Sequence, residues 1–501
     1  MTLIAESSGD APAAPGVDVV DLVVDGAARP ARTGARTAVL DPATGTTLAE
    51  VAAAGPEDVD DAVAAARAAQ PAWSRLSPLQ RAQHLFAVAA MVRRHGEDLA
   101  RTESLDTGKP LAQARADVEV TAGYFEFYAG FADKFYGETM PLAGDSFALT
   151  FREPHGVTGH IIPWNYPLQI GCRTIVPSLM VGNACVVKPA LEAPLSITRL
   201  GLLALEAGLP PGVLNVVPGD GGGAGAHLAD HPGIDHLSFT GGLETGVLVM
   251  TAAARHVRPV TLELGGKSPS LVFVDADLER ATAVLTKALI QNAGQTCSAG
   301  SRIVAVGSVH DELVDRLAKA FEEVTLGRGV DDPDMGPVIS AAQRDRVLGY
   351  IDGALVAGCA VASGGSAAEV AGLEGGYFVR PTLLVDVTPE AAVAREEVFG
   401  PVLTVLRAGD EAEALRIANG TDFGLVASVW TADLDRGMRL ARGIQAGQVY
   451  LNSYGAAGGI GLPFGGVKKS GFGREKGVEA VYEYTQAKTV VVNVACVGGG
   501  R

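Results

Sequence analysis

The amino-acid sequence predicts an α/β fold made of two successive units, each built on a parallel sheet covered by helices. From residue 147 onward, strand-like and helix-like stretches alternate in two blocks, which is typical of βαβ units. The length of 501 residues favours two or three domains over one simple core. Near its end the chain carries the uninterrupted apolar stretch AKTVVVNVACV, which as a strand must be covered by this chain or by a second copy.

Local patterns predict the elements of each block in order. Residues 56–135 are rich in alanine and begin with acidic residues, and apolar positions at helical spacing predict helices there. In the first block, NACVVKPA, GVLNVVPG, IDHLSFTG and RPVTLELGG favour strands, separated by helices at PLSITRLGLLALEAGLP, around GAGAHLADHP and at LETGVLVMTAAARH. The second block repeats this order with PSLVFVD, LERATAVLTKALIQNAG, SRIVAVG and VHDELVDRLAKAFEEV. Two such blocks predict two domains with a cleft between them.

Composition and charge exclude several classes of protein. The chain is 48% hydrophobic and 19% charged, as globular proteins are. Its formal net charge of −17 argues against a nucleic-acid or anionic-membrane partner. The longest apolar stretch is interrupted by three prolines and an arginine, so we expect no membrane span. Residues 1–17 lack a basic segment followed by an apolar core, so we expect a flexible leader and a cytoplasmic protein.

The cysteines are five in number and widely spaced: Cys172, Cys185, Cys297, Cys359 and Cys496. No Cys pair or Cys/His cluster has the spacing of a metal site, so we expect reduced thiols and no metal. Cys297 differs from the others because it lies in NAGQTCSAGSR, among small residues that would let a substrate approach. It is either a thiolate nucleophile for a carbonyl carbon or a buried structural cysteine, and this stretch alone favours neither.

Four other motifs have both a chemical and a structural interpretation. Asn165 in WNYP is either an oxyanion donor or a turn residue. Glu263 in LELGGKSP is either a general base with a raised pKa or a strand-end carboxylate paired with Lys267. FTGGLETG, residues 239–246, is either a phosphate-binding helix start or an ordinary turn. Lys188 in KPA lies either at the ligand-binding edge of a sheet or in solvent.

Seven segments in this order together resemble those of the NAD(P)-dependent aldehyde dehydrogenase superfamily. They are PWNYP, GNACVVKPA, FTGGLETG, LELGGKSP, GQTCSAGSR, REEVFGPV and LPFGGVKKSGFGRE, and the resemblance covers nearly the whole chain. It implies a Rossmann-like dinucleotide-binding domain, an α/β catalytic domain and a small β oligomerisation arm. The implied limits are a leader over 1–17, dinucleotide binding over 18–134 and 154–262, catalysis over 263–479, and the arm over 135–153 and 480–497.

The resemblance also implies oxidation of an aldehyde to a carboxylic acid. Cys297 would form a thiohemiacetal, and Asn165 with the backbone N–H of Cys297 would hold the oxyanion. After hydride transfer, Glu263 would activate the water that hydrolyses the thioester. Two alternatives are a CoA-acylating semialdehyde dehydrogenase, in which the hydrolytic Glu is typically absent, and a catalytically silent family member. The presence of both Glu263 and Cys297 argues against them.

The implied cofactor-binding residues surround an NAD or NADP site. Lys188 would bind the adenosine ribose, Gly241 and Gly246 would shape the helix start beneath the pyrophosphate, and Glu397 and Phe399 would contact the nicotinamide side, while Lys267 and Pro401 would be structural. The full implied set is Ile161, Pro163, Trp164, Lys188, Gly241, Gly242, Gly246, Leu264, Glu397 and Phe399.

The cofactor motifs depart from the family pattern at two positions. Leu191 stands where relatives that prefer NAD carry a glutamate, with Glu192 one residue later, and Gly242 replaces the usual serine. Without a carboxylate at Leu191, which would repel a 2′-phosphate, we expect either dinucleotide to bind.

The resemblance implies a substrate site made by Arg173, Asn165, Thr296 and Ser298. Arg173 stands where many relatives with apolar substrates carry Trp, and an arginine fork suits a carboxylate. We therefore expect a preference for polar or acidic aldehydes such as succinate semialdehyde. The alternative is that Arg173 forms a salt bridge in the tunnel wall or at a subunit contact. We expect a homodimer or homotetramer that binds a small aldehyde, without nucleic acid or membrane.

Overall fold

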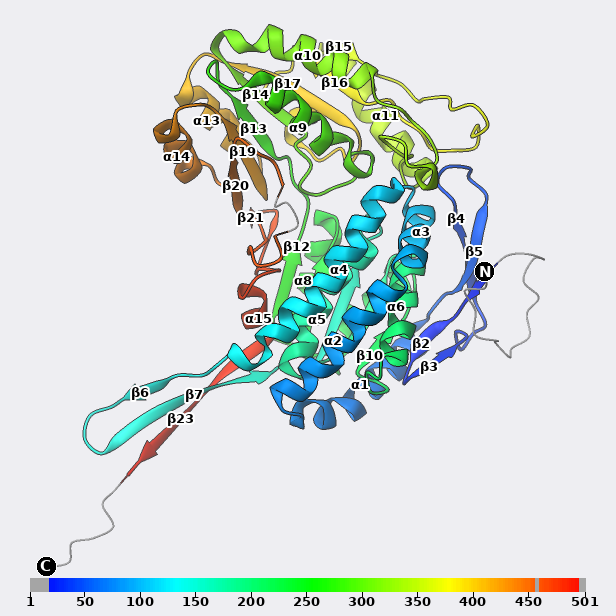
Figure 1. Ribbon diagram of the computed structural model, residues 1–501, viewed down its shortest axis with the longest axis vertical. Coiled ribbons are helices and arrows are strands. Elements are labelled where there is room, and N and C mark those ends of the chain that lie inside the picture. The colour runs from blue at the N-terminus through cyan, green and yellow to red at the C-terminus, as the bar shows by residue number, and fades with distance from the viewer. Residues whose placement is uncertain (1–17, 456–458, 495–501) are drawn as a thin grey trace, which may run out of the picture.

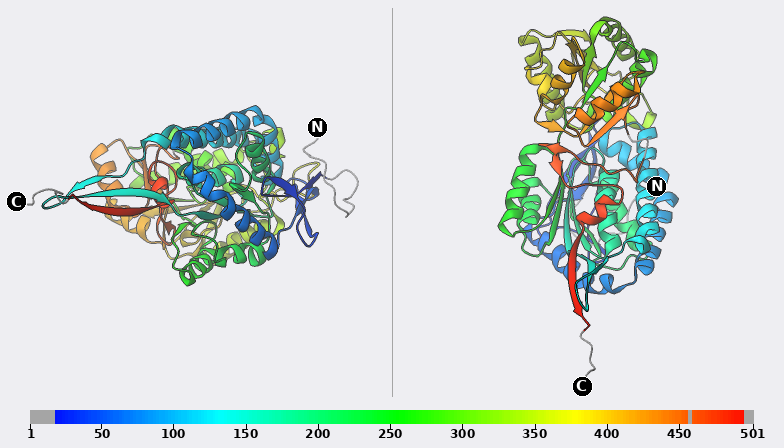
Figure 2. Two further views of the ribbon diagram at one scale, coloured as in Figure 1. Left: turned by 90° about the horizontal axis from the view of Figure 1, so that it is seen from below. Right: turned by 90° about the vertical axis from the view of Figure 1, so that its left-hand side faces the viewer.

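A computed structural model describes residues 18–455 and 459–494 (Figure 1). The predicted leader over residues 1–17, Cys496 and the last positions of the predicted C-terminal strand, 495–497, lie outside the described residues. Within them the chain forms two α/β units, and a narrow β arm projects from the first unit away from the second (Figure 2). No helix in these described ranges is long and apolar enough to cross a membrane.

The first unit is built on a sheet of eight strands among the described residues, in the order β22-β12-β11-β8-β9-β10-β2-β3. The neighbours from β12 to β10 run parallel, and the strands at both ends of the sheet join antiparallel. The strands are β2 (Leu22–Val24), β3 (Ala27–Arg29), β8 (Val157–Ile162), β9 (Ala184–Pro189), β10 (Leu214–Val216), β11 (His236–Thr240), β12 (Val260–Glu263) and β22 (Gly471–Phe472).

Helices cover both faces of this sheet, because successive strand residues point to opposite sides. In β9, Cys185 and Val187 pack toward α2 to α6, whereas Ala184 and Val186 pack toward α1, α7 and α8. The helices are α1 (Pro56–Arg75), α2 (Pro78–Arg94), α3 (Gly96–Thr107), α4 (Leu111–Phe131), α5 (Pro167–Val181), α6 (Leu195–Glu206), α7 (Ala226–Asp230) and α8 (Leu243–Arg255).

The second unit repeats this layering on a sheet of seven described strands, in the order β15-β16-β17-β14-β13-β19-β20. All neighbours are parallel except β15 with β16. The strands are β13 (Pro269–Val272), β14 (Arg302–Val306), β15 (Ala360–Ser363), β16 (Thr382–Val385), β17 (Val402–Ala408), β19 (Val426–Trp430) and β20 (Gln448–Leu451). Helices α9 (Leu278–Ile290) and α10 (His310–Glu322) pack on one face. The other face carries α11 (Ala341–Val356), α12 (Ala392–Arg395), α13 (Glu411–Asn419) and α14 (Leu434–Gly443).

The chain then returns from the second unit to the first. Strand β21 (Val467–Lys468) pairs with β18 (Phe423–Gly424) in the second unit, and β22 then joins the edge of β12 in the first. After α15 (Glu479–Glu483), strand β23 (Thr485–Asn493) pairs with β7 (Ser146–Pro154), which also pairs with β6 (Thr139–Pro141) to complete the arm. This return brings the segment 464–475 beside the edge of the first sheet.

A small sheet near the N-terminal end was not predicted. Strands β1 (Asp18–Val20), β4 (Arg36–Leu40) and β5 (Thr47–Ala52) pair in the order β1-β5-β4, whereas local patterns predicted no strand before residue 56. These strands are three to six residues long, so their local pattern is weak and their pairing depends on contacts distant in sequence.

Candidate active site

The parallel strands of the first sheet bring several predicted site residues to one edge. Strand β8 ends just before Pro163 and Trp164, β9 carries Lys188 near its end, and β12 ends at Glu263. The carboxyl ends of parallel strands share one edge of a sheet, where ligands of open α/β sheets lie. The backbone N–H of Gly241, after β11, donates to the Glu263 carbonyl oxygen at 3.0 Å, which fixes the start of the next turn beside the carboxylate.

The segment before Cys297 has an unusual backbone. Asn292, Ala293 and Gly294 all adopt left-handed φ angles, of 48°, 52° and 74°. A Cβ at Gly294 would overlap the Gly400 carbonyl, so this position requires glycine. The left-handed backbone of Ala293 is strained, because its Cβ crowds the following carbonyl oxygen. Such a conformation persists only where the surrounding structure enforces it. The chain therefore turns sharply out of α9 and presents Cys297 at the junction of the two units.

Cys297 itself is partly exposed among apolar and aromatic groups. It packs against Leu425 and Phe464, with Tyr450 and Tyr454 alongside. Burial raises the pKa of the Cys297 thiol to about 12, and nearby carboxyl groups add to this while Arg173 opposes it. The resting side chain is therefore a thiol, which needs a proton acceptor before it can attack.

Asn165 is held beside the segment 292–297 by two hydrogen bonds, one that it donates and one that it accepts. Its Nδ2 donates to the Gln295 carbonyl oxygen at 2.9 Å, and Asn292 Nδ2 donates to the Asn165 carbonyl oxygen at 3.0 Å. The side chain of Asn165 is buried. Because an amide nitrogen carries two hydrogens, the second one can be directed at an oxygen bonded to the substrate carbon.

Thr296 and Ser298, on either side of Cys297, are held by two tyrosines for which the sequence predicted no role. The Tyr166 hydroxyl lies 3.0 Å from Thr296 Oγ1, and the Tyr454 hydroxyl donates to the Ser298 carbonyl oxygen at 2.7 Å. Tyr166 directly follows Asn165 in WNYP. This adjacency to Asn165 was the only indication in the sequence that Tyr166 lies near the site, and it did not predict the contact with Thr296.

Glu263 is a buried carboxyl group whose two oxygens have no hydrogen-bond partner among the described residues. Burial raises the pKa of Glu263 well above its ordinary value, Glu475 adds to the shift, and Arg173 and Arg474 oppose it. A carboxyl group with a raised pKa is suited to general base catalysis near neutrality. Its unpaired oxygens leave it free to bind a water molecule.

Arg173 lies near Cys297 and Glu263, but its charge is already paired within the protein. The guanidinium is buried, forms an ion pair with Glu475, and lies 4.7 Å from the centre of the Phe464 ring. This ion pair is the arrangement that the alternative interpretation expected, and in it Glu475 already neutralises the charge of Arg173. Glu475 was within the motif SGFGRE but had no predicted role, because its partner is distant in sequence.

The other cofactor-site predictions fit a dinucleotide at the edge of the first sheet. Lys188 Nζ donates to the Gly219 carbonyl oxygen at 3.0 Å, and burial lowers the pKa of Lys188. Gly242 caps α8, and a Cβ there would meet no atom within 4 Å. A Cβ on Gly246 would press on Leu264 at 2.5 Å, so glycine lets α8 approach the strand. An anion can therefore approach the exposed N–H groups that begin this helix.

The second unit contributes Glu397 and Phe399 to the same region. Glu397 Oε1 accepts a 2.9 Å hydrogen bond from the Gly266 backbone N–H, and burial raises the pKa of Glu397 to about 7. Phe399 has a left-handed φ of 61° and packs edge-on to Trp164 with ring centres 5.3 Å apart. Predicted residues from both units thus meet across the junction, as a site that binds a cofactor and a substrate together requires.

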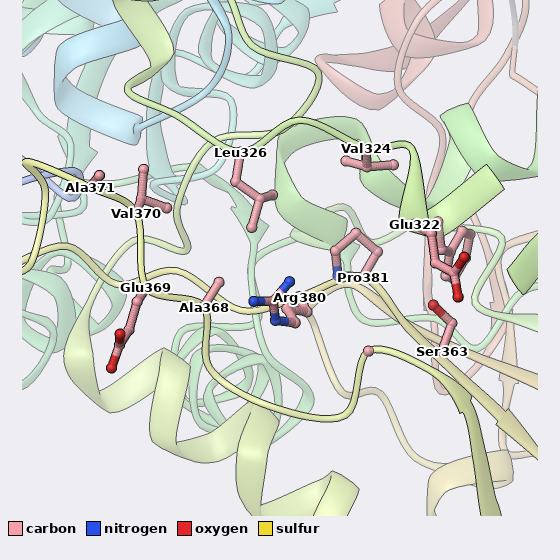
Figure 3. A pocket seen from close by; sticks show the side chains of 12 residues that line it. Glu322, Val324, Leu326, Ser363, Ala368, Glu369, Val370, Ala371, Arg380 and Pro381 are labelled. Atoms are coloured by element: carbon pink, nitrogen blue, oxygen red, sulfur yellow. The ribbon is translucent and has the colours of Figure 1, made fainter. Parts of the chain in front are cut away.

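Two other features lie apart from this site. A pocket of about 430 Å³ lies in the second unit, and no predicted site residue lines it (Figure 3). Its lining consists of Phe321, Glu322, Val324, Leu326, Ser363, Gly364, 368–371, Arg380 and Pro381. Asp60, His227 and His231 bring potential ligand atoms within 4.8 Å of one another. However, the Gly233 N–H donates to His231 Nδ1 at 2.8 Å, which puts the proton of a neutral ring on Nε2, the atom that faces Asp60. A protonated nitrogen cannot bind a metal, so we assign none here.

Comparison with known proteins identifies consistent relatives. A family model described as "Aldehyde dehydrogenase family" matches residues 29–490. A betaine aldehyde dehydrogenase of Cereibacter sphaeroides is 44% identical over 473 residues, which cover 94% of this chain and 96% of that protein. Among solved structures, a Burkholderia cenocepacia protein described provisionally as an aldehyde dehydrogenase is 51% identical, with a TM-score of 0.93 over 95% of this chain and 100% of that one. The NAD+ complex of an aldehyde dehydrogenase from Bacillus cereus is 40% identical, with a TM-score of 0.93 over 95% and 97%.

Proposed function

Because the chain belongs to the aldehyde dehydrogenase family, we propose that it oxidises an aldehyde to the carboxylic acid with a nicotinamide dinucleotide, using Cys297 as nucleophile. The observation that carries the proposal is the meeting of Cys297, Asn165 and Glu263 at the junction of the two units, with the buried Glu263 oxygens unpaired within the described part of the chain. Absorbance at 340 nm, followed with a panel of aldehydes and either dinucleotide, tests it. An absence of reduced cofactor with every aldehyde would contradict the proposal.

Each proposed step uses a group whose surroundings suit it. The partly exposed Cys297 thiol gives its proton to solvent water, and the thiolate Sγ attacks the carbonyl carbon. Asn165 Nδ2 and the Cys297 backbone N–H stabilise the resulting oxyanion. When bound, a nicotinamide dinucleotide would supply the hydride acceptor; Glu397 would hold it on the nicotinamide side, and Phe399 would lie near the ring. Glu263 then takes a proton from the water that attacks the thioester, and the acid leaves. The retention of Glu263 argues against transfer to CoA.

We propose betaine aldehyde, or another aldehyde without a carboxylate, as substrate. The relatives of 44% and 43% identity are both named betaine aldehyde dehydrogenase, and Glu475 already neutralises Arg173. A substrate carboxylate would therefore lose its hydration without gaining a free cation. We expect kcat/KM for betaine aldehyde to exceed that for succinate semialdehyde by at least about tenfold. Hexanal is the uncharged control, and a preference for succinate semialdehyde would refute this choice.

We also propose that both NAD and NADP are accepted. The Leu191 side chain packs with Val39 and Val51. It follows Lys188, which lies near the end of β9, by three residues. We expect wild-type kcat/KM to favour NAD by less than about a thousandfold, or about 4 kcal/mol. Leu191→Glu should lower kcat/KM for NADP at least about tenfold relative to NAD, because the new carboxylate repels a 2′-phosphate. Glu192→Gln is the matched control, and an unchanged ratio in Leu191→Glu would contradict the assignment.

We propose a homo-oligomer that contacts through the arm. In the arm's order β23-β7-β6, β23 pairs along one edge only among the described residues, and Val490 and Val491 are exposed on it. Such an edge favours pairing with another chain. Light scattering should give a dimer or tetramer of the 51.4 kDa chain, and Val491→Asp should reduce its mass. Val356→Asp, at an exposed position of the second unit, should leave the mass unchanged. A wild-type monomer would refute the assembly.

A further inference from the structure

A buried charged cluster lies behind the active site, at the junction of α3 and α4. Lys109 Nζ is 3.1 Å from Glu103 Oε1 and 2.7 Å from Asp117 Oδ2. The lysine and glutamate side chains are 0% exposed, and the aspartate side chain is 6% exposed. Buried ion pairs are weak evidence for stability, because desolvation offsets much of their attraction. Stability alone therefore gives little reason for this cluster, so its neighbours are informative.

Lys109 is connected to the active site through one aromatic ring. Its Nζ lies 4.0 Å from the centre of the Tyr166 ring, and the hydroxyl of that ring lies 3.0 Å from Thr296 Oγ1. Tyr166 directly follows Asn165, and Thr296 directly precedes Cys297. The face of the Tyr166 ring thus contacts the cluster, and its hydroxyl contacts Thr296, next to Cys297. The backbone of Tyr166 is bonded directly to Asn165, the proposed oxyanion donor.

Helix α4 makes further contacts with both of these segments. Gln169 Nε2, on α5, donates to Asp117 Oδ1 at 3.3 Å. The Asn292 backbone N–H, in the strained turn before Cys297, donates to Gln113 Oε1 at 3.0 Å. These contacts hold the start of α5 and the turn before Cys297 to the same helix, α4. Because Tyr166 lies between Asn165 and α5 and also contacts Thr296, a shift of its ring would change the distance between Asn165 and Cys297.

We propose that Lys109 is a positioning residue, which through its contact with the Tyr166 ring sets the distance between Asn165 and Cys297. The inference rests on the proposed function, since it assumes that these two residues hold and attack the substrate. A desolvated cation is attracted to the face of an aromatic ring, and small displacements of reacting groups reduce rates strongly. Lys109 touches neither substrate nor cofactor in this role.

The test compares the loss of two buried cations. Lys109→Met/Asp117→Asn removes the cluster lysine together with one of its carboxylates, and Arg81→Met is the control. Arg81 is also buried, and donates to the carbonyl oxygens of Met180, Leu76 and Ser74. The measurements are kcat, KM, the melting temperature, and the rate of Cys297 alkylation by iodoacetamide, located by peptide mapping. We expect the cluster variant to lose about tenfold in kcat with KM nearly unchanged, and to be alkylated more slowly. The control should lose melting temperature only.

A double-mutant cycle separates positioning from a general structural effect. In a Tyr166→Leu background, the cluster substitution should change kcat less than about twofold, because the ring that carries its effect is gone. In Tyr166→Phe, which keeps the ring, the effect of the cluster substitution should persist. A full tenfold loss in Tyr166→Leu, or wild-type kcat in the cluster variant, would overturn the inference. Failure of the proposed function would show differently, as a wild-type protein that oxidises no aldehyde.

Discussion

Cys297→Ser should abolish turnover while the protein remains folded. A serine hydroxyl is a far weaker nucleophile than a thiol, and no adjacent base pairs with it, so kcat should fall by about three orders of magnitude or more. Formation of reduced cofactor at 340 nm measures the loss. The melting temperature should stay near the wild-type value, because the replaced group is small and partly exposed.

Cys359→Ser is the matched control for this substitution. Cys359 is buried among the apolar side chains of the second unit, with no predicted site residue among them. Its replacement should lower stability modestly and leave kcat near that of the wild type. If Cys297→Ser retained wild-type turnover, the reaction would not proceed through this sulfur and the proposed function would fail.

Glu263→Gln should separate the two halves of the reaction. Glutamine has nearly the same shape but cannot take a proton from water, so the thioester should form and then persist. We expect one equivalent of reduced cofactor per site in a rapid burst, followed by a steady-state rate lowered by about 10²–10⁴-fold. Rapid mixing with absorbance detection distinguishes the burst from the slow phase. Glu312→Gln, on the surface of α10 and paired with Arg316, should behave as the wild type.

The same carboxyl group predicts a pH dependence. Burial raises the pKa of Glu263, and only its ionised form can act as a base. The steady-state rate should therefore fall as the pH drops through this raised pKa, and Glu263→Gln should lack that limb of the profile. An initial burst absent in Glu263→Gln would place the residue before hydride transfer instead and contradict the assignment.

Most of the fold could be predicted from local patterns. The alternation of β8, β9, β11 and β12 with helices is visible in short windows, because burial of a strand between two helical layers demands continuous apolar residues. The short strands β1, β4 and β5 carried no such signal. The two-residue strand β22 was also missed, because its pairing with β12 depends on the return of the chain from the second unit.

The sequence by itself determined the enzyme family and the candidate groups: a cysteine among small residues, an amide in WNYP and a carboxyl group before a Gly-Gly turn, in the order of that family. Their spacing along the chain is enough, since each motif forms its own local turn. Only the tertiary structure decided the partners of the buried charges. A buried arginine or lysine must be compensated, but the sequence offers many carboxylates, and packing alone selects Glu475 for Arg173 and brings Lys109 against Tyr166.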